Sequence, residues 1–461
     1  MSEGYTPSEK YLSRLCRRSF LSLWSYTNLH TDEGRKNEKD VGDELCDVLV
    51  IFGNDVVIFS DKTVEFNRSK DINVAWKRWF KKAILKSANQ IYGAESWLRQ
   101  HQNRIYIDRY CQKPFPIPLP SPERIRVHRV VVAHGIYHAC TEYFGRSLGS
   151  LIIHSGLEGS DHYLKPFHIG HINKKKGFVH VFEDFTLDSV LREQDTVQDF
   201  IAYLSKRKQL LSKEKPIVVA AGDEQLLAVY LTNENSEGKH DFVLPDKEGD
   251  YVYFEEGSWE SMVQHPQYVA KKKADQISYE WDRLIEYLIQ YSSGAFPGQG
   301  PIPFSNSEQA LRLMASEPRI RRRELAEGLI GLLTYNTNNS IIGRLIYSSK
   351  FPDRAHLFLV CDPSDGQDYQ EYRRKRAALL IAYCKVAKLL RPSANYIVGI
   401  ATESLRKEET SFELVALDAR EWTSERQEEA VRLQKQYSLL LESETTKKTE
   451  RRYPEWPKAT D

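Results

Sequence analysis

The stretch that decides the fold of the N-terminal part is Gly42–Lys62, which reads GDELCDVLVIFGNDVVIFSDK. Two apolar runs, residues 48–52 and 56–59, are separated by the short polar segment 53–55. A Gly-Asn pair between two runs rich in Val and Ile is typical of a tight turn between antiparallel strands. We therefore predict a β-hairpin over residues 47–62, with acidic residues before its first strand and Ser-Asp-Lys at the end of its second.

The polar residues of this hairpin gather at its open end, where acids precede the first strand and Lys62 ends the second. Carboxylates bind hard divalent cations such as Mg²⁺. Such a cation polarises a phosphodiester and lowers the pKa of a bound water, and a nearby ammonium group stabilises the charge that develops on the phosphate. The pattern therefore favours metal-dependent phosphodiester hydrolysis, with an ordinary buried hairpin as the alternative.

The register of the hairpin decides which of its polar side chains share a face. Directly opposed residues of an antiparallel pair lie on one face, and faces alternate along each strand. A two-residue turn makes Asp47 oppose Ser60, places Lys62 on the same face and points Asp61 away. A three-residue turn, 53–55, makes Asp47 oppose Asp61 and points Lys62 away. A regular hairpin cannot bring Asp47, Asp61 and Lys62 to one face, whereas a β-bulge could.

The order of acid, strand, turn, strand and lysine, followed by a helix, resembles the PD-(D/E)xK nuclease superfamily, which has the restriction-endonuclease-like fold. The resemblance covers roughly residues 10–155 and is closest to the nuclease-related and Mrr-like branches. It implies that Asp47 is the central metal ligand, that Lys62 is the catalytic lysine, and that Glu44 or Glu38 is the upstream acid.

The sequence departs from the superfamily pattern at Ser60, where a second Asp or Glu is usual. Some restriction enzymes of the superfamily also carry serine there and recruit an acid from the following helix, so Asp61 or Glu95 would have to serve here. The resemblance then implies a Mg²⁺- or Mn²⁺-dependent endonuclease acting on DNA. Its expected catalytic residues are Asp47, Lys62, Asp61 and Glu44, and its expected metal ligands are Asp47, Asp61, Glu44 and Glu95. The departure at Ser60 leaves open a catalytically inactive, nuclease-like module that binds nucleic acid or protein.

Residues 74–100 predict a long amphipathic helix, with apolar residues at helical spacing on one face and basic residues on the other. Cations on an exposed helix face bind phosphates without reading sequence. We expect DNA contacts from Lys77, Arg78, Lys81, Lys82 and Gln90, the last matching a glutamine that the nuclease-related branches carry in this helix.

The length of 461 residues is too great for one ordinary core. We predict an α/β protein with a nuclease-like domain over 1–155, a mixed α/β middle domain over 156–300 and an α/β domain with a charged tail over 301–461. The Gly- and Pro-rich segment 292–303 is expected to be a linker. Among the individual elements, we predict helices within 8–27, a strand at 226–231 and a βαβ-like stretch over 356–401.

The net charge of +1 provides no large field to hold a polyanion, so any nucleic-acid contact must come from local basic runs. Several such runs are most simply solvated faces; they lie at 174–176, 271–273, 319–323 and 373–376. Because binding by so neutral a chain would be weak, we expect activity to be gated by a separate protein partner or by assembly into an oligomer.

No apolar run approaches the ~18 residues that a membrane span needs, and the six cysteines are scattered without metal or redox spacing. We therefore expect a cytoplasmic protein with no membrane partner, and by analogy with large orphan nucleases an anti-phage defence effector. His134 and His138, with Cys140 and Glu142, have zinc-ligand residue types. Ordinary histidines are favoured because no distinctive ligand spacing accompanies them.

Overall fold

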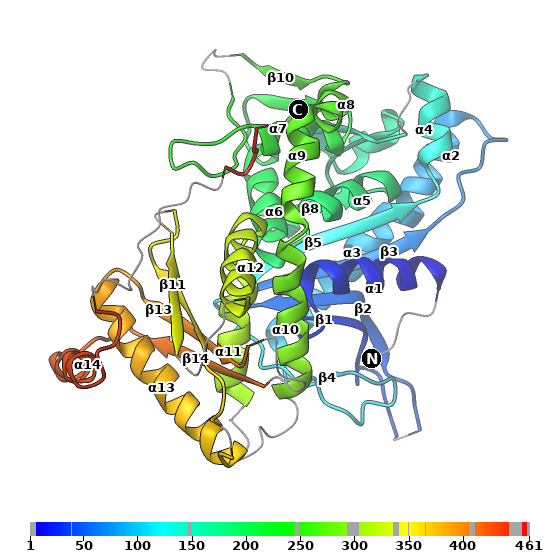
Figure 1. The fold of residues 1–461 in the computed structure, drawn as a ribbon. Coiled ribbons are helices and arrows are strands. Elements are labelled where there is room, and N and C mark those ends of the chain that lie inside the picture. The colour runs from blue at the N-terminus through cyan, green and yellow to red at the C-terminus, as the bar shows by residue number, and fades with distance from the viewer. Residues whose placement is uncertain are drawn as a thin grey trace. The chain divides into compact units, whose positions relative to one another are not determined.

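The computed structural model describes residues 6–37, 39–145, 149–244, 249–292, 304–334, 341–348, 350–364, 366–404, 411–441 and 454–458. The chain forms two compact units, Met1–His265 and Pro266–Asp461, referred to below as the N-terminal and C-terminal units. Each unit combines helices with β-sheet, which confirms the predicted mixed α/β class (Figure 1). In the described chain, no helix combines the length and the apolarity needed to cross a membrane.

The main sheet of the N-terminal unit has the strand order β4-β1-β2-β3-β5-β8. Its strands are β1 (Ser25–Thr31), β2 (Asp43–Phe52), β3 (Asp55–Thr63), β4 (Ile105–Tyr106), β5 (Arg126–His134) and β8 (Val179–Phe182). Strands β1, β2 and β3 form an antiparallel meander, whereas β3, β5 and β8 run parallel. Phe52 opposes Asp55, so the hairpin turn has two residues, and Gly53 occupies the left-handed region with φ +61°.

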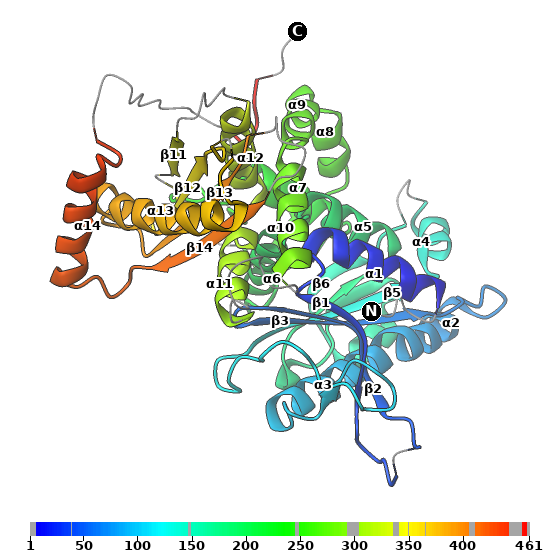
Figure 2. The same cartoon turned by 60° about the horizontal axis from the view of Figure 1, so that its bottom comes forward.

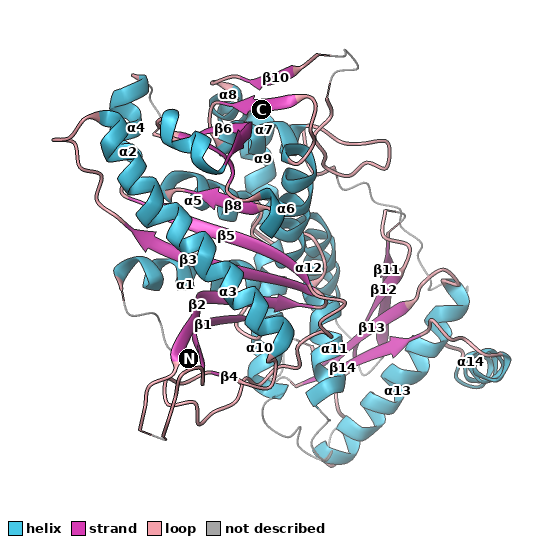
Figure 3. Ribbon diagram, turned by 180° about the vertical axis from the view of Figure 1, so that it is seen from behind, coloured by secondary structure: helices cyan, strands magenta, loops and turns pink. Residues whose placement is uncertain are grey.

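Helices cover both faces of this sheet. Helix α1 (Pro7–Phe20) packs on β1, β2 and β3 from one side (Figure 2). On the other side lies one continuous helix built from α2 (Ile72–Phe80), a π-helical turn η1 (Lys81–Leu85) and α3 (Lys86–Gln100) (Figure 3). Its apolar stripe is buried, which confirms the predicted amphipathic helix; α3 packs on the sheet and α2 on residues 159–164. The stripe includes Trp76, Trp79, Phe80, Ile84, Ile91 and Leu98.

Two sequence-based element predictions are wrong. The helix expected within 8–27 ends at Phe20, and residues 25–31 form strand β1, which is buried along its length and pairs with β2. The strand expected at 226–231 is part of helix α7 (Asp223–Thr232). That segment is apolar on nearly all sides because the helix is buried in the unit, and periodicity does not separate a buried helix from a buried strand.

A second, four-stranded sheet of the N-terminal unit has the order β10-β9-β6-β7. Its strands are β6 (Ile152–Glu158), β7 (His168–His171), β9 (Ile217–Ala220) and β10 (Tyr251–Phe254). The surrounding helical elements are α4 (Tyr137–Phe144), η2 (Gly159–Leu164), η3 (Lys174–Lys176), α5 (Asp184–Glu193), α6 (Val197–Leu211), α7 and α8 (Ser258–Gln264). Because β8 completes the main sheet from beyond residue 155, the boundary expected there falls inside this unit.

The C-terminal unit contains a four-stranded sheet in the order β11-β12-β13-β14. The strands are β11 (Ile342–Tyr347), β12 (Arg354–Val360), β13 (Tyr396–Thr402) and β14 (Phe412–Asp418). Its helices are α9 (Pro266–Asp275), α10 (Ser278–Ser292), α11 (Phe304–Ala315), α12 (Arg319–Leu333), α13 (Tyr369–Leu390) and α14 (Ser424–Tyr437). Strands β12 and β13 are parallel and joined by α13, which confirms the βαβ prediction. Most of the expected linker, residues 293–303, lies outside the described residues.

The basic run 319–323 is an internal ion network of this unit. Arg319 and Arg322 bind the Asp282 carboxylate at 2.8 and 2.6 Å, and Arg323 binds Asp275 at 2.5 Å. All three arginines are buried, so the charges stabilise the packing of α12 on α9 and α10 and do not form a surface patch. Removing one partner of such a pair is costly because the other charge stays buried.

Candidate active site

The candidate site lies where β2 and β3 part. The ladder between them runs from the Phe52–Asp55 pair to the Val48–Phe59 pair. Beyond that point, β2 continues to Asp43 beside β1, while β3 continues to Thr63 beside β5. The sheet therefore opens between the two strands at the end where the acidic residues and the lysine of the hairpin gather.

Asp47 is the buried carboxylate at this opening. Its Oδ2 accepts a hydrogen bond from the backbone N–H of Asp61 at 2.7 Å, which bridges the parted strands. Burial raises the pKa of Asp47 to about 7. The hydrogen bond from Asp61 lowers this pKa, whereas the neighbouring carboxylates of Glu44, Asp61 and Glu9 raise it further. Asp47 is thus a buried carboxylate surrounded by other acids.

A bulge brings Glu44 to the face of Asp47. Leu29 of β1 opposes Cys46, but His30 opposes Glu44, so β2 carries one extra residue at this point. An extra residue shifts the alternation of side chains by one, and residues 44 and 47 then share a face. Burial, and next the charge of Glu9, raise the pKa of Glu44, whereas the ammonium of Lys62 lowers it. Glu9 lies in the first turn of α1 and was not identified from the sequence.

Ser60 and Lys62 complete this face from β3. The ladder ends at Val48–Phe59, and continued alternation along the two strands beyond it directs Asp47, Ser60 and Lys62 to one side. Ser60 is fully buried and donates a hydrogen bond of 3.2 Å from its hydroxyl to Oε1 of Gln90 on α3. Ser60 and Gln90 thus meet directly, the two-residue turn is that of the first predicted register, and Lys62 is half-buried at the edge.

Asp61, expected as a metal ligand, lies on the opposite face of the sheet. Its side chain is fully buried, and its Oδ1 lies 2.5 Å from Nε2 of His134 on β5. Nδ1 of His134 in turn contacts Asp184 at the start of α5. Burial lowers the pKa of His134, but the contacts with Asp184 and Asp61 outweigh burial and raise it to about 10. Strand alternation is the reason for this placement, because Asp61 stands between Ser60 and Lys62.

Glu95, the other expected source of a second acid, is already paired. Its carboxylate binds Arg99 at 3.1 Å and Arg129 at 2.5 Å. Glu95 lies more than one helical turn beyond Gln90 on α3, at the level of Arg129, which pairs with Ile58 of β3. Glu95 therefore lies on the helix-covered side of the sheet, but nearer the hairpin turn than Ser60, and its carboxylate is engaged by two arginines. Glu38, the alternative to Glu44, lies outside the described residues.

The two carboxylates of this face suit a divalent cation whose remaining ligands come from water and substrate. Within the described ranges, no three or more His, Cys, Asp or Glu side chains are grouped to hold a metal ion by themselves. Mg²⁺ commonly takes one or two carboxylates and completes its shell with waters and substrate phosphates. Glu44 and Asp47 supply two carboxylates on one face, and the raised pKa of Asp47 shows that a cation there would relieve a buried charge. The residues present therefore fit Mg²⁺ or Mn²⁺ in that mode.

The basic residues expected to bind DNA divide into two groups. Lys77, Arg78, Lys81 and Lys82 are exposed on the outer side of α2 and η1, whereas Gln90 faces Ser60. The ammonium groups of Lys77 and Lys81 each lie 5.1 Å from the ring centre of Tyr163. We call the four exposed cations the basic ridge. A stacked aromatic ring of this kind stabilises a cation by roughly 0.5–1 kcal/mol at exposed sites.

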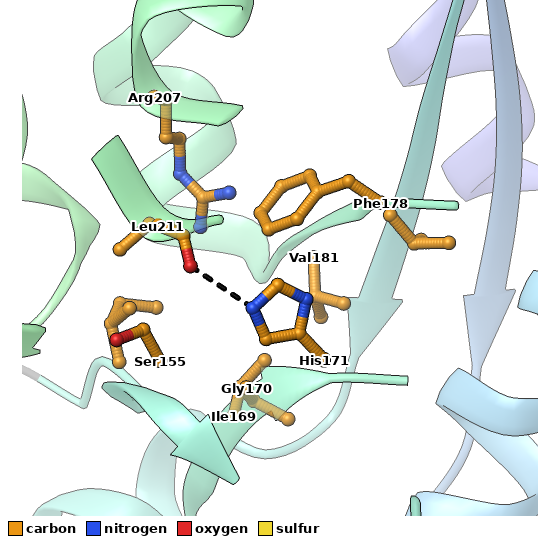
Figure 4. A pocket seen from close by; sticks show the side chains of 10 residues that line it. Ser155, Ile169, Gly170, His171, Phe178, Val181, Arg207 and Leu211 are labelled. Atoms are coloured by element: carbon orange, nitrogen blue, oxygen red, sulfur yellow. Dashed lines mark hydrogen bonds between the residues drawn. The ribbon is translucent and has the colours of Figure 1, made fainter. Parts of the chain in front are cut away.

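Other candidate sites prove to be internal structure. His134, one of the residues with a zinc-ligand side chain, is engaged by Asp61 and Asp184. A small pocket between β6, β7, β8 and α6 is lined mainly by apolar side chains (Figure 4). There Nε2 of His171 donates to the Leu211 carbonyl at 3.0 Å, and Arg207 binds Asp223 at 2.6 Å. These polar groups are used within the fold.

No protein-family model, curated protein or solved structure matches the chain. The function of the site is therefore argued from its own residues.

Proposed function

We propose that the N-terminal unit is a Mg²⁺- or Mn²⁺-dependent endonuclease domain of the restriction-endonuclease-like kind and that it cleaves DNA. The observation that carries this proposal is the face at the parted end of β2 and β3, where Glu44, Asp47, Ser60 and Lys62 share one side. The layout of acid, strand, turn, strand, lysine and following helix supports the resemblance to PD-(D/E)xK nucleases. The helix supplies Gln90 to the same face.

Glu44 and Asp47 are the residues that would hold the cation. The bound cation supplies Lewis acidity and a water of lowered pKa. The ammonium of Lys62 acts on Glu44 by its charge and would stabilise the negative charge that develops on the phosphate during attack. Ser60 fixes Gln90 by donating to its Oε1, which directs the amide NH₂ of Gln90 outward as a donor for a phosphate oxygen.

The basic ridge supports DNA as the substrate. The indole N–H of Trp79 donates to the carbonyl of Val64 at 2.9 Å, which fastens the helix that carries the ridge two residues beyond Lys62. Lys77 and Lys81 are one helical turn apart and are held by the same tyrosine ring. Cations fixed beside a phosphodiester site bind the backbone and set its position without reading bases.

The net charge of +1 supports regulated action, because the chain as a whole has little attraction for a polyanion. A separate protein partner or self-assembly would then raise the local concentration of DNA at the site. This behaviour suits a cytoplasmic effector of anti-phage defence, which must stay inactive until it is triggered.

Nicking of supercoiled plasmid tests the proposal directly. We expect wild type with Mg²⁺ or Mn²⁺ to cleave, and Asp47→Ala and Lys62→Ala to lose at least about 100-fold in rate, because each removes transition-state stabilisation of about 3 kcal/mol. Glu95→Ala is the matched control, since this acid is bound to arginines, and it should cleave at a rate close to wild type. Equal rates for all four proteins would contradict the proposal.

The basic ridge gives a second expectation. The double charge reversal Lys77→Glu/Lys81→Glu should weaken DNA binding and lower the salt dependence, with the slope of log K against log salt decreasing by about 2. Arg14→Glu/Arg18→Glu is the control, because these exposed arginines have the same four-residue spacing on α1, which covers the other face of the sheet. Equal effects of the two double variants on filter-binding isotherms would show that the ridge is not the contact.

A non-catalytic, nuclease-like interaction module is the second candidate. It is favoured by Ser60 in place of an acid and by the engagement of Glu95 with Arg99 and Arg129. If the plasmid stays intact while the ridge variants still weaken DNA binding, this second candidate replaces the first.

A further inference from the structure

Behind the candidate site, a buried ion pair holds the residue between Ser60 and Lys62. The Asp61 side chain is fully buried, and Nε2 of His134 lies 2.5 Å from its Oδ1. His134 Nδ1 contacts Asp184, whose side chain is 47 % exposed. Both ring nitrogens lie close to carboxylate oxygens, so the His134 ring bridges the two acids.

This ion pair connects to Asp47 through the backbone. The N–H of Asp61 donates to Oδ2 of Asp47 at 2.7 Å, across the gap where β2 and β3 have stopped pairing. No ladder hydrogen bond between these strands fixes the Asp61 peptide at this level. The position of that N–H therefore depends on what holds Asp61, namely its pairing with Val132 of β5 and its contact with His134.

We propose that His134, supported by Asp184, is a positioning residue of the site that clamps Asp61 behind the sheet and thereby fixes the backbone N–H that orients Asp47. The clamp joins three elements, because Asp61 lies on β3, His134 ends β5 and Asp184 begins α5. It also fixes the directions of Ser60 and Lys62, since both flank Asp61 and point to the other face. This inference rests on the proposed function for its chemistry, but the geometry it describes is independent of cleavage.

The same two strands provide a matched control. At the other end of β3, His128 of β5 has its Nε2 3.0 Å from Oδ1 of Asp55, and His128 is likewise buried. Six residues, or about 20 Å of strand, separate Asp55 from Asp61. His128→Gln removes a His–Asp pair between the same strands without touching the site.

The experiment measures Mn²⁺ binding by electron paramagnetic resonance and hydrogen exchange of the segment 59–62 in the full chain. Residues that orient a metal ligand typically contribute 10- to 100-fold in affinity, so His134→Gln should weaken Mn²⁺ binding at least about tenfold and accelerate exchange in that segment. His128→Gln should do neither. Asp184→Asn, an exposed change that leaves the Asp61–His134 pair, should shift both readouts in the same direction but less, and it keeps the test decisive if His134→Gln does not fold.

Equal Mn²⁺ affinity and equal exchange in the His134 and His128 variants would overturn the clamp, since the pair would then be general packing. If wild type and Asp47→Ala bind Mn²⁺ alike, the proposed metal-dependent function fails. Hydrogen exchange alone then tests the clamp. Faster exchange of the segment 59–62 in the His134 and Asp184 variants, but not in the His128 variant, supports the clamp, and unchanged exchange rejects it.

Discussion

Replacing Asp47 with asparagine is expected to stabilise the chain at about pH 8 while it abolishes cleavage. The folded-state pKa of Asp47 is about 7, above its ordinary value of 3.8, because burial and neighbouring carboxylates disfavour its charge. The folded chain thus binds this proton more tightly than the unfolded chain does. The stability gained from this protonation is fully present below about pH 4 and is lost as the pH rises through the folded-state pKa, a loss on the order of 4 kcal/mol.

Asparagine removes this cost, because it is neutral and its carbonyl still accepts the hydrogen bond from the Asp61 N–H. Calorimetric melting at about pH 5 and about pH 8 should show that the gain of Asp47→Asn grows with pH. Millimolar Mg²⁺ should raise the melting temperature of wild type and leave that of Asp47→Asn unchanged.

Asp55→Asn is the control for this expectation. Asp55 lies at the other end of β3, where Arg126 and His128 outweigh its burial and lower its pKa. Its contribution to stability is present above its unfolded pKa and is lost on acidification, so Asp55→Asn should destabilise the chain at about pH 8. If Asp47→Asn and Asp55→Asn were both more stable than wild type, asparagine would be acting through a general effect, and the explanation from the burial of Asp47 would be contradicted.

The second large effect is expected in the C-terminal unit, where Arg376→Leu should destabilise the sheet by about 3–5 kcal/mol. The Arg376 guanidinium is buried, lies 2.8 Å from Glu403 and also binds Glu413. The guanidinium also donates hydrogen bonds to the hydroxyl groups of Tyr372 and Ser411. Its N–H groups are therefore satisfied by protein groups. Leucine leaves the two glutamates buried without this charge.

Hydrogen exchange of β13 and β14 measures this loss directly within the unit. Arg374→Leu is the control, because Arg374 is two residues away on the same helix and exposed. Surface changes of this kind are usually within about 0.5 kcal/mol. If the two variants exchange alike, the glutamates have found other partners, and the ion network does not determine the stability of the unit.

Part of the candidate site could be predicted from the sequence. Register arithmetic on the hairpin identified the face shared by Asp47, Ser60 and Lys62, because strand alternation is local and regular. Gln90 was found through the resemblance. Glu44 was identified by its position in the chain, but the bulge that turns it to this face depends on β1, which the sequence did not reveal.

The residues behind the site could not be found in the same way. Asp61, His134 and Asp184 are separated by about 50 residues or more along the chain, and no spacing rule joins them. They meet because β3 and β5 are parallel neighbours and α5 begins beside the end of β5. The basic run 319–323 was predicted to be a solvated face, and this prediction is wrong for a related reason. Its acidic partners lie on α9 and α10, and sequence composition does not show which residues pack together.

The sequence by itself determined the hairpin over residues 47–62 and the amphipathic helix that follows, because turn chemistry and hydrophobic periodicity act over a few residues. Only the tertiary structure decided that β2 and β3 part at Val48–Phe59, that Asp61 turns to the other face and pairs with His134, and that Glu95 is bound by arginines. These outcomes depend on which distant strands and helices become neighbours, and burial and charge pairing between them are settled only when the whole unit has packed.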